Sequence, residues 1–264
     1  KEKFNSDNNP LSSPDWLRDH HNAKLNSRHE FAKKHLVSNA KTLVDLGCGT
    51  GLWLDIYDKL LPESCDFFGL DESIESLRTA EKTAENWKRE TSFAKVDLSN
   101  SSKLPKADIY LAFNIFPYLK EPQKLLEKIK LGLNPGGKLI IRQYDGFDIN
   151  FGPMEADLKL SIHNELFFSL SKKNNFKHYE RDSIFKLVTS SGFNVESIYF
   201  DRFEEISPYS DTFKVYLKNT IAWMKLFLTD VTSTAVCEWE FDYLDGDKNK
   251  VSYFKESYLV AIMS

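Results

Sequence analysis

The stretch VDLGCGTG at residues 44–51 determines how the rest of the chain is interpreted. A β-branched run, Thr42–Leu46, leads into three glycines at alternate positions, and a helical pattern, Trp53–Leu61, follows them. Glycines allow a tight turn and a close approach of the backbone to a ligand. The first N–H groups of the helix have no partner within the helix. The stretch therefore predicts a nucleotide-binding turn between a strand and a helix, with a plain tight turn as the alternative.

Strand-like runs and helical patterns alternate from residue 42 to residue 200. The expected strands are Thr42–Leu46, Asp66–Leu70, Phe93–Val96, Ile109–Phe113, Lys138–Arg142 and Val195–Phe200. The expected helices between them are Trp53–Leu61, Ser73–Trp87, Pro122–Leu133 and Asp182–Ser191. This alternation predicts an α/β fold whose parallel sheet is covered on both faces. Ligands of such sheets lie beyond the carboxyl ends of the strands.

The segments outside this alternation define the expected organisation. Residues 12–37 predict one or two helices, residues 147–180 a long connection with a helix around Glu155–Leu170, and Ser257–Met263 a last strand. We therefore expect four parts: an N-terminal helical cap (1–40), a core (41–200), a helical lid or insertion (201–250) and a final core strand (251–264).

Residues 201–250 are longer than a hairpin link requires. Ser207-Pro208 suits a helix start, and apolar residues recur at helical spacing within Pro208–Leu228. A strand-like run, Val236–Leu244, and a turn, Asp245-Gly246-Asp247, follow. The helix either packs on the edge of the sheet or forms a lid whose aromatic side chains, Tyr216 and Trp223 among them, line an acceptor pocket. Surface contact with a membrane or a partner chain is a weaker third alternative, because three lysines do not make a strongly basic face.

Composition excludes several classes of protein. The 264 residues are 41% hydrophobic and 28% charged, which excludes a disordered chain. The net charge of −4 offers no domain-wide basic field, so we expect no nucleic-acid partner. Three cysteines are too few for a disulfide framework and suit reduced thiols. No apolar run approaches the roughly 18 residues of a membrane span, and Lys1–Pro10 has no signal-peptide pattern. We expect a soluble cytoplasmic protein.

The spacing of the glycines distinguishes between two kinds of nucleotide site. A dinucleotide fingerprint requires a third glycine three positions after Gly49, where this chain has Leu52. Asp71 stands 20 residues after Gly51, at the end of the second expected strand, where a carboxylate can bind both hydroxyls of a ribose. A helix N-cap is the alternative role for Asp71. Asp97 follows the third expected strand, where an Asp is more often a turn residue.

These motifs, in this order, resemble the class I S-adenosylmethionine-dependent methyltransferases. The resemblance covers about residues 40–200 and the last strand, and includes the turn Pro135-Gly136-Gly137. It implies a Rossmann-like, mainly parallel seven-stranded sheet with helices on both faces, an antiparallel last strand and a helical cap. S-adenosylmethionine is the implied cofactor. The implied cofactor-binding residues are Asp45, Gly47, Cys48, Gly49, Gly51, Asp71, Glu72, Asp97, Leu98 and Asn114.

The segment after the fourth strand, residues 112–119, is similar to the part of the family that contacts the methionine of the cofactor. It lacks the compact Asn-Pro-Pro-Tyr of amino-methylating DNA and protein-glutamine enzymes, so it does not favour that subclass. The aromatic faces of Phe113, Phe116 and Tyr118 suit a cationic sulfonium.

The sequence indicates catalytic residues less strongly than it indicates the cofactor site. Tyr144 and Asp145 follow the fifth strand, and His163 and Glu165 lie in the helix after it; we select Tyr144 and His163. His20 and His21 belong to the expected cap. A solvated surface position is the alternative for each of these residues. A base is needed only if the acceptor must lose a proton, and a carboxylate acceptor needs none.

Metal-ligand spacing is not found around the histidines, so no metal site is expected. The leading hypothesis is a methyltransferase that acts on a small molecule by in-line displacement. The alternatives are an RNA or protein methyltransferase, which needs an open basic groove, and a member of the same fold that binds the cofactor without transferring methyl groups. The oligomeric state is left open.

Overall fold

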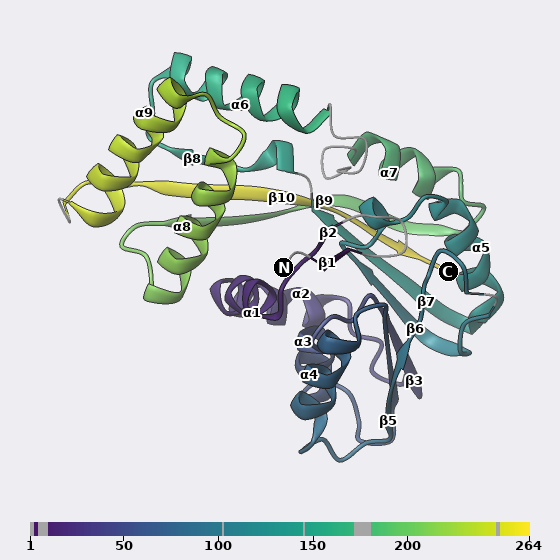
Figure 1. Ribbon diagram of the computed structural model, residues 1–264. Helices are drawn as coiled ribbons and strands as arrows, with labels where there is room; N and C mark the ends of the chain where they lie inside the picture. Colours follow the sequence, from purple (N-terminus) through teal and green to yellow (C-terminus); the bar gives the residue numbers. More distant parts are fainter. Residues whose placement is uncertain (1–2, 5–9, 102, 145, 172–180, 247–248) are drawn as a thin grey trace.

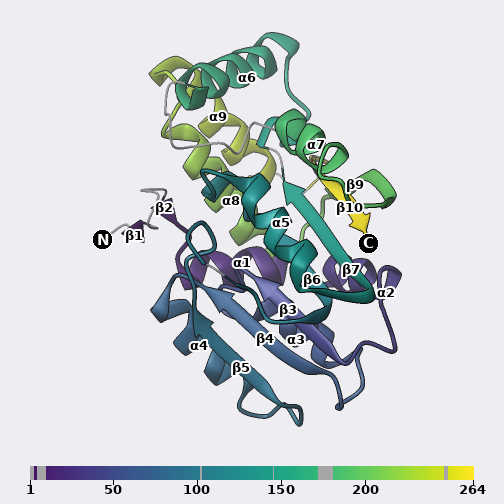
Figure 2. The same ribbon diagram turned by 90° about the vertical axis from the view of Figure 1, so that its right-hand side faces the viewer.

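The protein is described by a computed structural model that covers residues 3–4, 10–101, 103–144, 146–171, 181–246 and 249–264. Figures 1 and 2 show a twisted sheet with helices on both faces and a group of helices over one end. The helices are α1 (Pro14–Ala23), α2 (Leu25–Lys34), α3 (Leu52–Asp58), α4 (Ile74–Ala84), α5 (Pro122–Gly132), α6 (Ala156–Ser171), α7 (Arg181–Thr189), α8 (Asp211–Lys225) and α9 (Asp230–Glu240).

Within these described ranges, the main sheet has eight strands in the order β5-β4-β3-β6-β7-β10-β8, with β9 also paired to β10. Neighbouring strands from β5 to β7 run parallel, whereas β10 is antiparallel to β7, β8 and β9. The strands are β3 (Thr42–Leu46), β4 (Asp66–Asp71), β5 (Thr91–Lys95), β6 (Ala107–Phe113), β7 (Leu133–Tyr144), β8 (Asn150–Gly152), β9 (Val195–Ile206) and β10 (Tyr253–Met263); β1 (Lys3–Phe4) pairs with β2 (Pro10–Leu11).

The predicted α/β fold with its mainly parallel sheet and antiparallel last strand is confirmed. The eighth strand is β8, a three-residue strand that pairs with the start of β10 at Tyr253–Lys255, beyond the part of β10 that pairs with β7. Because β9 takes the other edge of β10 over the same residues, β8 lies on the same edge of β10 as β7 and adds one short strand to the seven that the resemblance implied.

Two buried clusters show why the strands are apolar on both sides. In β3, Leu43 packs into one cluster with residues of α2 and α3, whereas Val44 and Leu46 pack into the other with residues of α5 and α7. Alternate residues of a strand point to opposite faces of the sheet. The sheet is thus the middle of three layers, and its site lies at an edge rather than on a face.

Residues 201–250 differ from the expectation in two places. Strand β9 continues to Ile206, and α8 begins at Asp211, because Ser210 rather than Ser207 accepts the capping hydrogen bond, from Phe213 N (3.2 Å). The prediction of a strand over Val236–Leu244 is wrong: these residues lie in α9 and in a π-helical turn, Phe241–Asp245.

The helical state of α9 has a local cause. Thr229 caps the helix by accepting from Thr232 N, and the buried residues Thr232, Val236 and Trp239 recur at helical spacing on one face. Tertiary packing overrides the β propensity of this run. Of the predicted turn at residues 245–247, Asp245 belongs to the π-helical turn and Asp247 lies outside the described residues.

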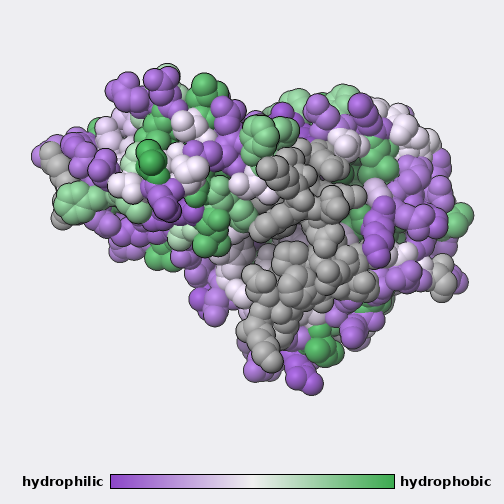
Figure 3. Space-filling view, turned by 45° about the horizontal axis from the view of Figure 1, so that its top comes forward, coloured by the Kyte–Doolittle hydropathy of each residue, from purple (hydrophilic) through white to green (hydrophobic). Residues whose placement is uncertain are grey.

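The surface in Figure 3 is mainly hydrophilic, with hydrophobic side chains scattered in small groups. None of the helices in the described ranges combines the length and the apolar character needed to cross a membrane.

Candidate functional site

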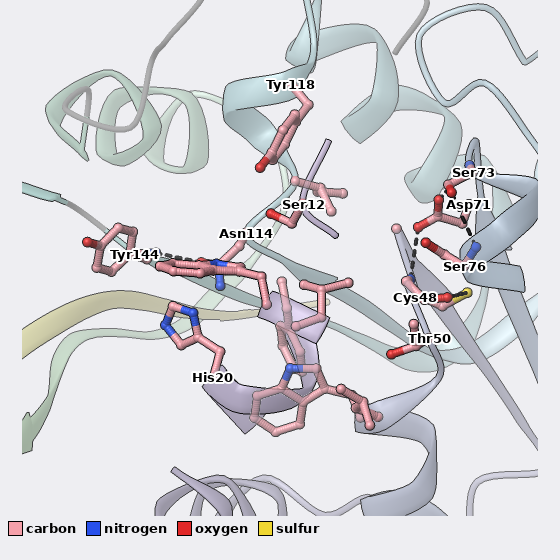
Figure 4. A pocket seen from close by; sticks show the side chains of 18 of the residues that line it. Ser12, His20, Cys48, Thr50, Asp71, Ser73, Ser76, Asn114, Tyr118 and Tyr144 are labelled. Carbon is pink, nitrogen blue, oxygen red and sulfur yellow. Dashed lines mark hydrogen bonds between the residues drawn. The ribbon is translucent and has the colours of Figure 1, made fainter. Parts of the chain in front are cut away.

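A cavity of about 580 Å³ lies at the carboxyl ends of the parallel strands. Residues from successive strands line it in the order of the sheet: Asp97 after β5, Asp71 at β4, Gly47 after β3, Asn114 after β6 and Tyr144 at β7. Figure 4 shows Asp71, Ser73 and Cys48 at one end of this cavity, with Tyr144 and His20 at the other end. The topology thus gathers the residues that the sequence placed after each strand.

The glycine turn is held in a shape that favours glycine at each alternate position. Gly47, Gly49 and Gly51 have φ angles of +69°, +54° and +78°, which residues with a Cβ rarely adopt. The N–H groups of Gly47 and Cys48 both donate to Leu70 O, at 2.7 and 3.0 Å. A Cβ on Gly47 would lie 2.5 Å from Ile115 Cγ2.

Gly47, Cys48 and Gly49 line the cavity, whereas Gly51 does not. Gly51 is the residue before α3, and a Cβ there would lie 3.2 Å from Ala80 Cβ of the neighbouring helix α4. Its place in the motif therefore concerns helix packing. Cys48 is buried, and burial raises the pKa of its thiol well above the usual value.

Asp71 connects two parts of the site. Its Oδ2 accepts from Gly49 N (2.8 Å) and its Oδ1 accepts from Ser73 N (2.7 Å). Burial raises the pKa of this carboxyl, and the backbone N–H groups of Ser73, Gly49 and Glu72 oppose that rise. Ser73, not Asp71, is the N-cap of α4. Each carboxylate oxygen can accept more than one bond, so Asp71 can also bind hydroxyl groups in the cavity.

The third strand end forms the neighbouring wall. Asp97 Oδ1 accepts from Ser99 N (2.9 Å) and Asn100 N (3.2 Å), which makes Asp97 a turn residue that also lines the cavity. Leu98 and Glu72 line it as well. Val96 N donates to Asp71 O (2.9 Å), and this bond keeps the β4 and β5 ends together.

Asn114 is placed by both of its neighbouring strands. Its φ of +57° is rare for a residue other than glycine. Its N–H donates to Arg142 O (3.0 Å), and its side-chain Oδ1 accepts from Tyr144 N (2.7 Å). Asn114 therefore joins the ends of β6 and β7 at the middle of the cavity.

Asp45 is buried and is not among the residues that line the cavity. The side chain is 2% exposed, and its Oδ2 has no hydrogen-bond partner among the described residues. Burial, with a smaller contribution from Asp71, raises the pKa of Asp45 well above its ordinary value.

The structure separates the two residues selected as catalytic. Tyr144 lines the cavity, with its ring centroid 5.9 Å from that of Tyr258. His163 lies in α6, which packs against α9, and it is not among the cavity-lining residues. Glu165 accepts from Thr229 N (2.6 Å) and so supports α9. Asp145 is outside the described residues. Phe113 and Tyr118 line the cavity, whereas Phe116 is in the core.

Helices α1, α2 and α8 close the cavity. The sequence predicted some of the residues that they contribute and missed others. Sequence reasoning named His20, Tyr216 and Trp223 as belonging to the expected cap and lid, and all three line the cavity. It missed Arg28 and Tyr258, because neither follows a parallel strand nor belongs to a motif. No local pattern of the sequence marks either residue as part of the site.

Arg28 is a cation of the cavity wall. Its guanidinium lies 5.0 Å from the centroid of the Trp53 ring, and its Nη1 lies 2.9 Å from His21 Nδ1. Its buried Nε has no hydrogen-bond partner among the described residues. Burial lowers the pKa of Arg28 to about 10, so the group remains charged at neutral pH.

A buried polar cluster lies beneath the end of the cavity near Tyr144. Lys24 Nζ is 3.0 Å from His20 Nε2, donates to Tyr216 Oη and Tyr258 Oη at 3.0 Å each, and pairs with the Glu256 carboxylate. Tyr216 donates to Glu256 Oε2 (3.0 Å), and Tyr258 donates to Oε1. The cluster joins the cap, α8 and β10, and all its members are buried or half-buried.

The residues present fit S-adenosylmethionine. The turn at Gly47 and Gly49 admits a ligand close to the backbone, Asp71 faces the cavity with acceptor capacity, and Arg28 has an unsatisfied donor suited to a carboxylate. Among the described residues, no group of three metal-ligating side chains could hold a metal ion.

Comparison with known proteins agrees with this geometry. Residues 37–220 match the family described as "Methyltransferase domain". A trans-aconitate 2-methyltransferase of Rhizobium leguminosarum bv. trifolii is 29% identical over 110 residues, 41% of each chain. A carboxy-S-adenosyl-L-methionine synthase of Photobacterium profundum is 27% identical over 139 residues, 51% of this chain and 54% of the other. The chain thus spans about half or less of the length of these relatives.

A solved structure supports the fold. The S-adenosylmethionine-dependent methyltransferase from Aquifex aeolicus superposes with a TM-score of 0.53 at 15% identity, over 94% of this chain and 99% of that chain. Because the family match covers more than half of the chain, the chain belongs to the class I S-adenosylmethionine-dependent methyltransferase family, whose cofactor is S-adenosylmethionine.

Proposed function

We propose that this protein transfers a methyl group from S-adenosylmethionine to a small-molecule acceptor. The observation that carries this proposal is one cavity that extends from Asp71 to Tyr144 and is covered by α1 and α8. Its volume of about 580 Å³ is in the range of small-molecule sites. The relative named for trans-aconitate supports a small acceptor.

The cofactor would be bound along the strand ends. Asp71 would accept from the ribose hydroxyls, while Asp97 and Leu98 would contact the adenine amine and ring. The methionine part would lie beside Asn114, with its carboxylate on Arg28, whose buried Nε requires an acceptor. Glu72 and the backbone of Gly47, Cys48 and Gly49 complete this set of contacts.

The bound cofactor supplies a methyl group on a sulfonium, and the protein positions the acceptor in line with it. Tyr118, Phe113 and Tyr144 offer aromatic faces near the strand ends where a cationic sulfur is stabilised. Tyr144 would orient the acceptor. His163 has no role in this proposal, because it does not line the cavity.

The organisation of the chain suits this role. We infer that residues 1–40 act as a cap and residues 201–250 as a lid on the core formed by residues 41–200 and 251–264. Two contacts support the cap and the lid: Ser12 bonds to the Tyr118 hydroxyl, and the ring centroids of His20 and Tyr216 are 4.5 Å apart. The three cysteines are free, which favours a reducing, cytoplasmic location.

A second candidate is a member that uses the same cavity for chemistry on the cofactor itself. The similarity to a relative named carboxy-S-adenosyl-L-methionine synthase supports this second candidate. Incubation with methyl-labelled S-adenosylmethionine distinguishes the two. Label on a new molecule, with equimolar S-adenosylhomocysteine, supports methyl transfer, and label that stays on a modified cofactor supports the second candidate.

A further inference from the structure

The two ends of the cavity differ in charge. The acidic lining residues Asp71, Glu72 and Asp97 all belong to the ends of β4 and β5. The opposite end is aromatic and, within the described part of the chain, has no carboxylate in its lining. Tyr144 and His20 lie there (Figure 4), the rings of Trp16 and Tyr216 lie against His20, and the ring of Tyr258 lies against Tyr144. Trp223 follows Tyr216 two turns further along α8 and also lines the cavity. This end is where the proposed function places the acceptor.

His20 is the imidazole of this acceptor end, and its neighbours define which nitrogen holds the proton. Lys24 Nζ lies 3.0 Å from His20 Nε2. The three hydrogens of this ammonium group are shared among four atoms within reach, which are His20 Nε2, Tyr216 Oη, Tyr258 Oη and Glu256 Oε1. A proton on Nε2 would point at the ammonium group and be repelled by it, so we place the proton of the neutral ring on Nδ1. Among the described residues, no hydrogen bond engages Nδ1, so this nitrogen is available to a ligand.

The charges around His20 support this assignment. The cations facing it are Lys24, Arg28 and Arg142, and the one carboxylate of the cluster, Glu256, pairs with Lys24. Burial and these cations hold the pKa of His20 well below 6.5, so its ring is neutral. Burial lowers the pKa of Lys24 to about 8, with Glu256 opposing the change, so the ammonium form dominates at neutral pH.

This tautomer limits the chemistry of the acceptor. A ring with its proton on Nδ1 donates a hydrogen bond into the cavity and cannot remove a proton there. Resting on the proposed methyl transfer, we propose that the acceptor is a carboxylic acid, bound as the carboxylate by Nδ1–H of His20, and that the product is its methyl ester.

The reaction balances without a base. One carboxylate oxygen forms a bond to the methyl carbon while the carbon–sulfur bond breaks, and that electron pair stays on sulfur. An anion and a sulfonium cation thus give two neutral groups, and no proton is released. The rings of Trp16, Trp223 and Tyr258 around this end favour an acid with a flat, apolar body.

The first test concerns the proton and does not depend on turnover. Long-range proton–nitrogen NMR spectra of the ¹⁵N-histidine-labelled protein, saturated with S-adenosylhomocysteine, report which ring nitrogen of His20 is protonated. The His20→Asn variant identifies the His20 signals. Protonation at Nδ1 with a bare Nε2 is expected, and a proton on Nε2 overturns the proposal. Failure of S-adenosylhomocysteine to bind contradicts the proposed function instead.

The second test concerns the product. The protein is incubated with a metabolite extract and methyl-labelled S-adenosylmethionine, and the labelled products are treated with mild base, which releases methanol from esters but not from ethers or N-methyl amines. Labelled methanol is expected. Base-stable label, or the absence of any labelled ester from a protein that binds S-adenosylhomocysteine, overturns the proposal.

Variants then connect the product to His20. His20→Phe should lower kcat/KM for the acid about 10- to 100-fold, and His20→Asn, whose amide retains a donor near the position of Nδ1, should recover most of that loss. Affinity for S-adenosylhomocysteine should change less than twofold in both. His29→Phe on α2, outside the cavity, is the matched control. An equal loss in His20→Asn and His20→Phe contradicts the donor role.

Discussion

Replacing Asp71 by Ala should weaken both cofactor binding and folding. The carboxylate accepts from Gly49 N at 2.8 Å and from Ser73 N at 2.7 Å. A hydrogen bond to a charged acceptor contributes about 1.5–3 kcal/mol. Burial of the charged carboxylate offsets part of this contribution, so we expect the free energy of unfolding to fall by at most about 3 kcal/mol for the two bonds.

The loss of cofactor affinity should be of similar size. Two further bonds, from ribose hydroxyls to Asp71, contribute about 2–4 kcal/mol together, which corresponds to a 30- to 1,000-fold rise in Kd. Glu81→Ala removes an exposed carboxylate from the same helix, α4, and should leave both quantities unchanged. The free energy of unfolding and the Kd of Asp71→Asn should lie between those of the wild type and Asp71→Ala, because the amide oxygen of Asn replaces one acceptor.

Urea unfolding measures the free energy of unfolding of each variant. Calorimetric titration with S-adenosylhomocysteine, without urea and at a temperature where each variant is folded, measures the Kd. A Kd for Asp71→Ala within threefold of the wild type would refute the ribose assignment. An unchanged free energy of unfolding would refute the claim that Asp71 stabilises the fold by joining the glycine turn to the start of α4.

Four further changes have defined outcomes. Gly47→Ala places a Cβ 2.5 Å from Ile115 Cγ2 at a φ of +69°, so thermal unfolding should show a loss of at least about 1 kcal/mol, with weaker cofactor binding in calorimetry. Trp223→Ala should lower acceptor turnover while the Kd for S-adenosylhomocysteine stays within twofold; equal kinetic constants would make α8 purely structural. Asp45 has a raised pKa, so its charged form opposes folding once the pH exceeds the usual value near 3.8; Asp45→Asn should raise the free energy of unfolding at pH 8, and a decrease contradicts this reasoning. Burial lowers the pKa of His21 to about 4. Neutral His21 therefore contributes up to about 3 kcal/mol to the free energy of unfolding above the unfolded pKa of 6.5, and this contribution is lost as the pH falls from 6.5 to about 4. The difference in acid unfolding between the wild type and His21→Phe measures it.

The core of the fold could be predicted because local patterns and packing agree there. Thr42–Leu46 was predicted with its observed bounds, since a strand buried on both faces is rich in apolar residues, here Leu43, Val44 and Leu46. The run Val236–Leu244 was not, because its β-rich composition is outweighed by the buried face of α9. Propensity alone does not contain such tertiary contacts.

The candidate site was predictable only where it follows from the sheet. Asp71, Asp97 and Asn114 each come directly after a parallel strand, so topology brings them together without further information. Arg28 and Tyr258 come from a cap helix and an antiparallel strand, and Glu256 meets Lys24 across 232 residues of sequence. No local pattern encodes those encounters. His163 was selected for its chemistry, and the structure places it on α6, away from the cavity lining.

The most direct measurement of the central claim is a calorimetric titration of the purified protein with S-adenosylhomocysteine, with NAD as the comparison ligand. Saturable binding of S-adenosylhomocysteine at one site per chain is expected, together with no heat from NAD, because the turn has Leu52 where a dinucleotide fingerprint has glycine. Saturable binding of NAD with no response to S-adenosylhomocysteine would contradict the account.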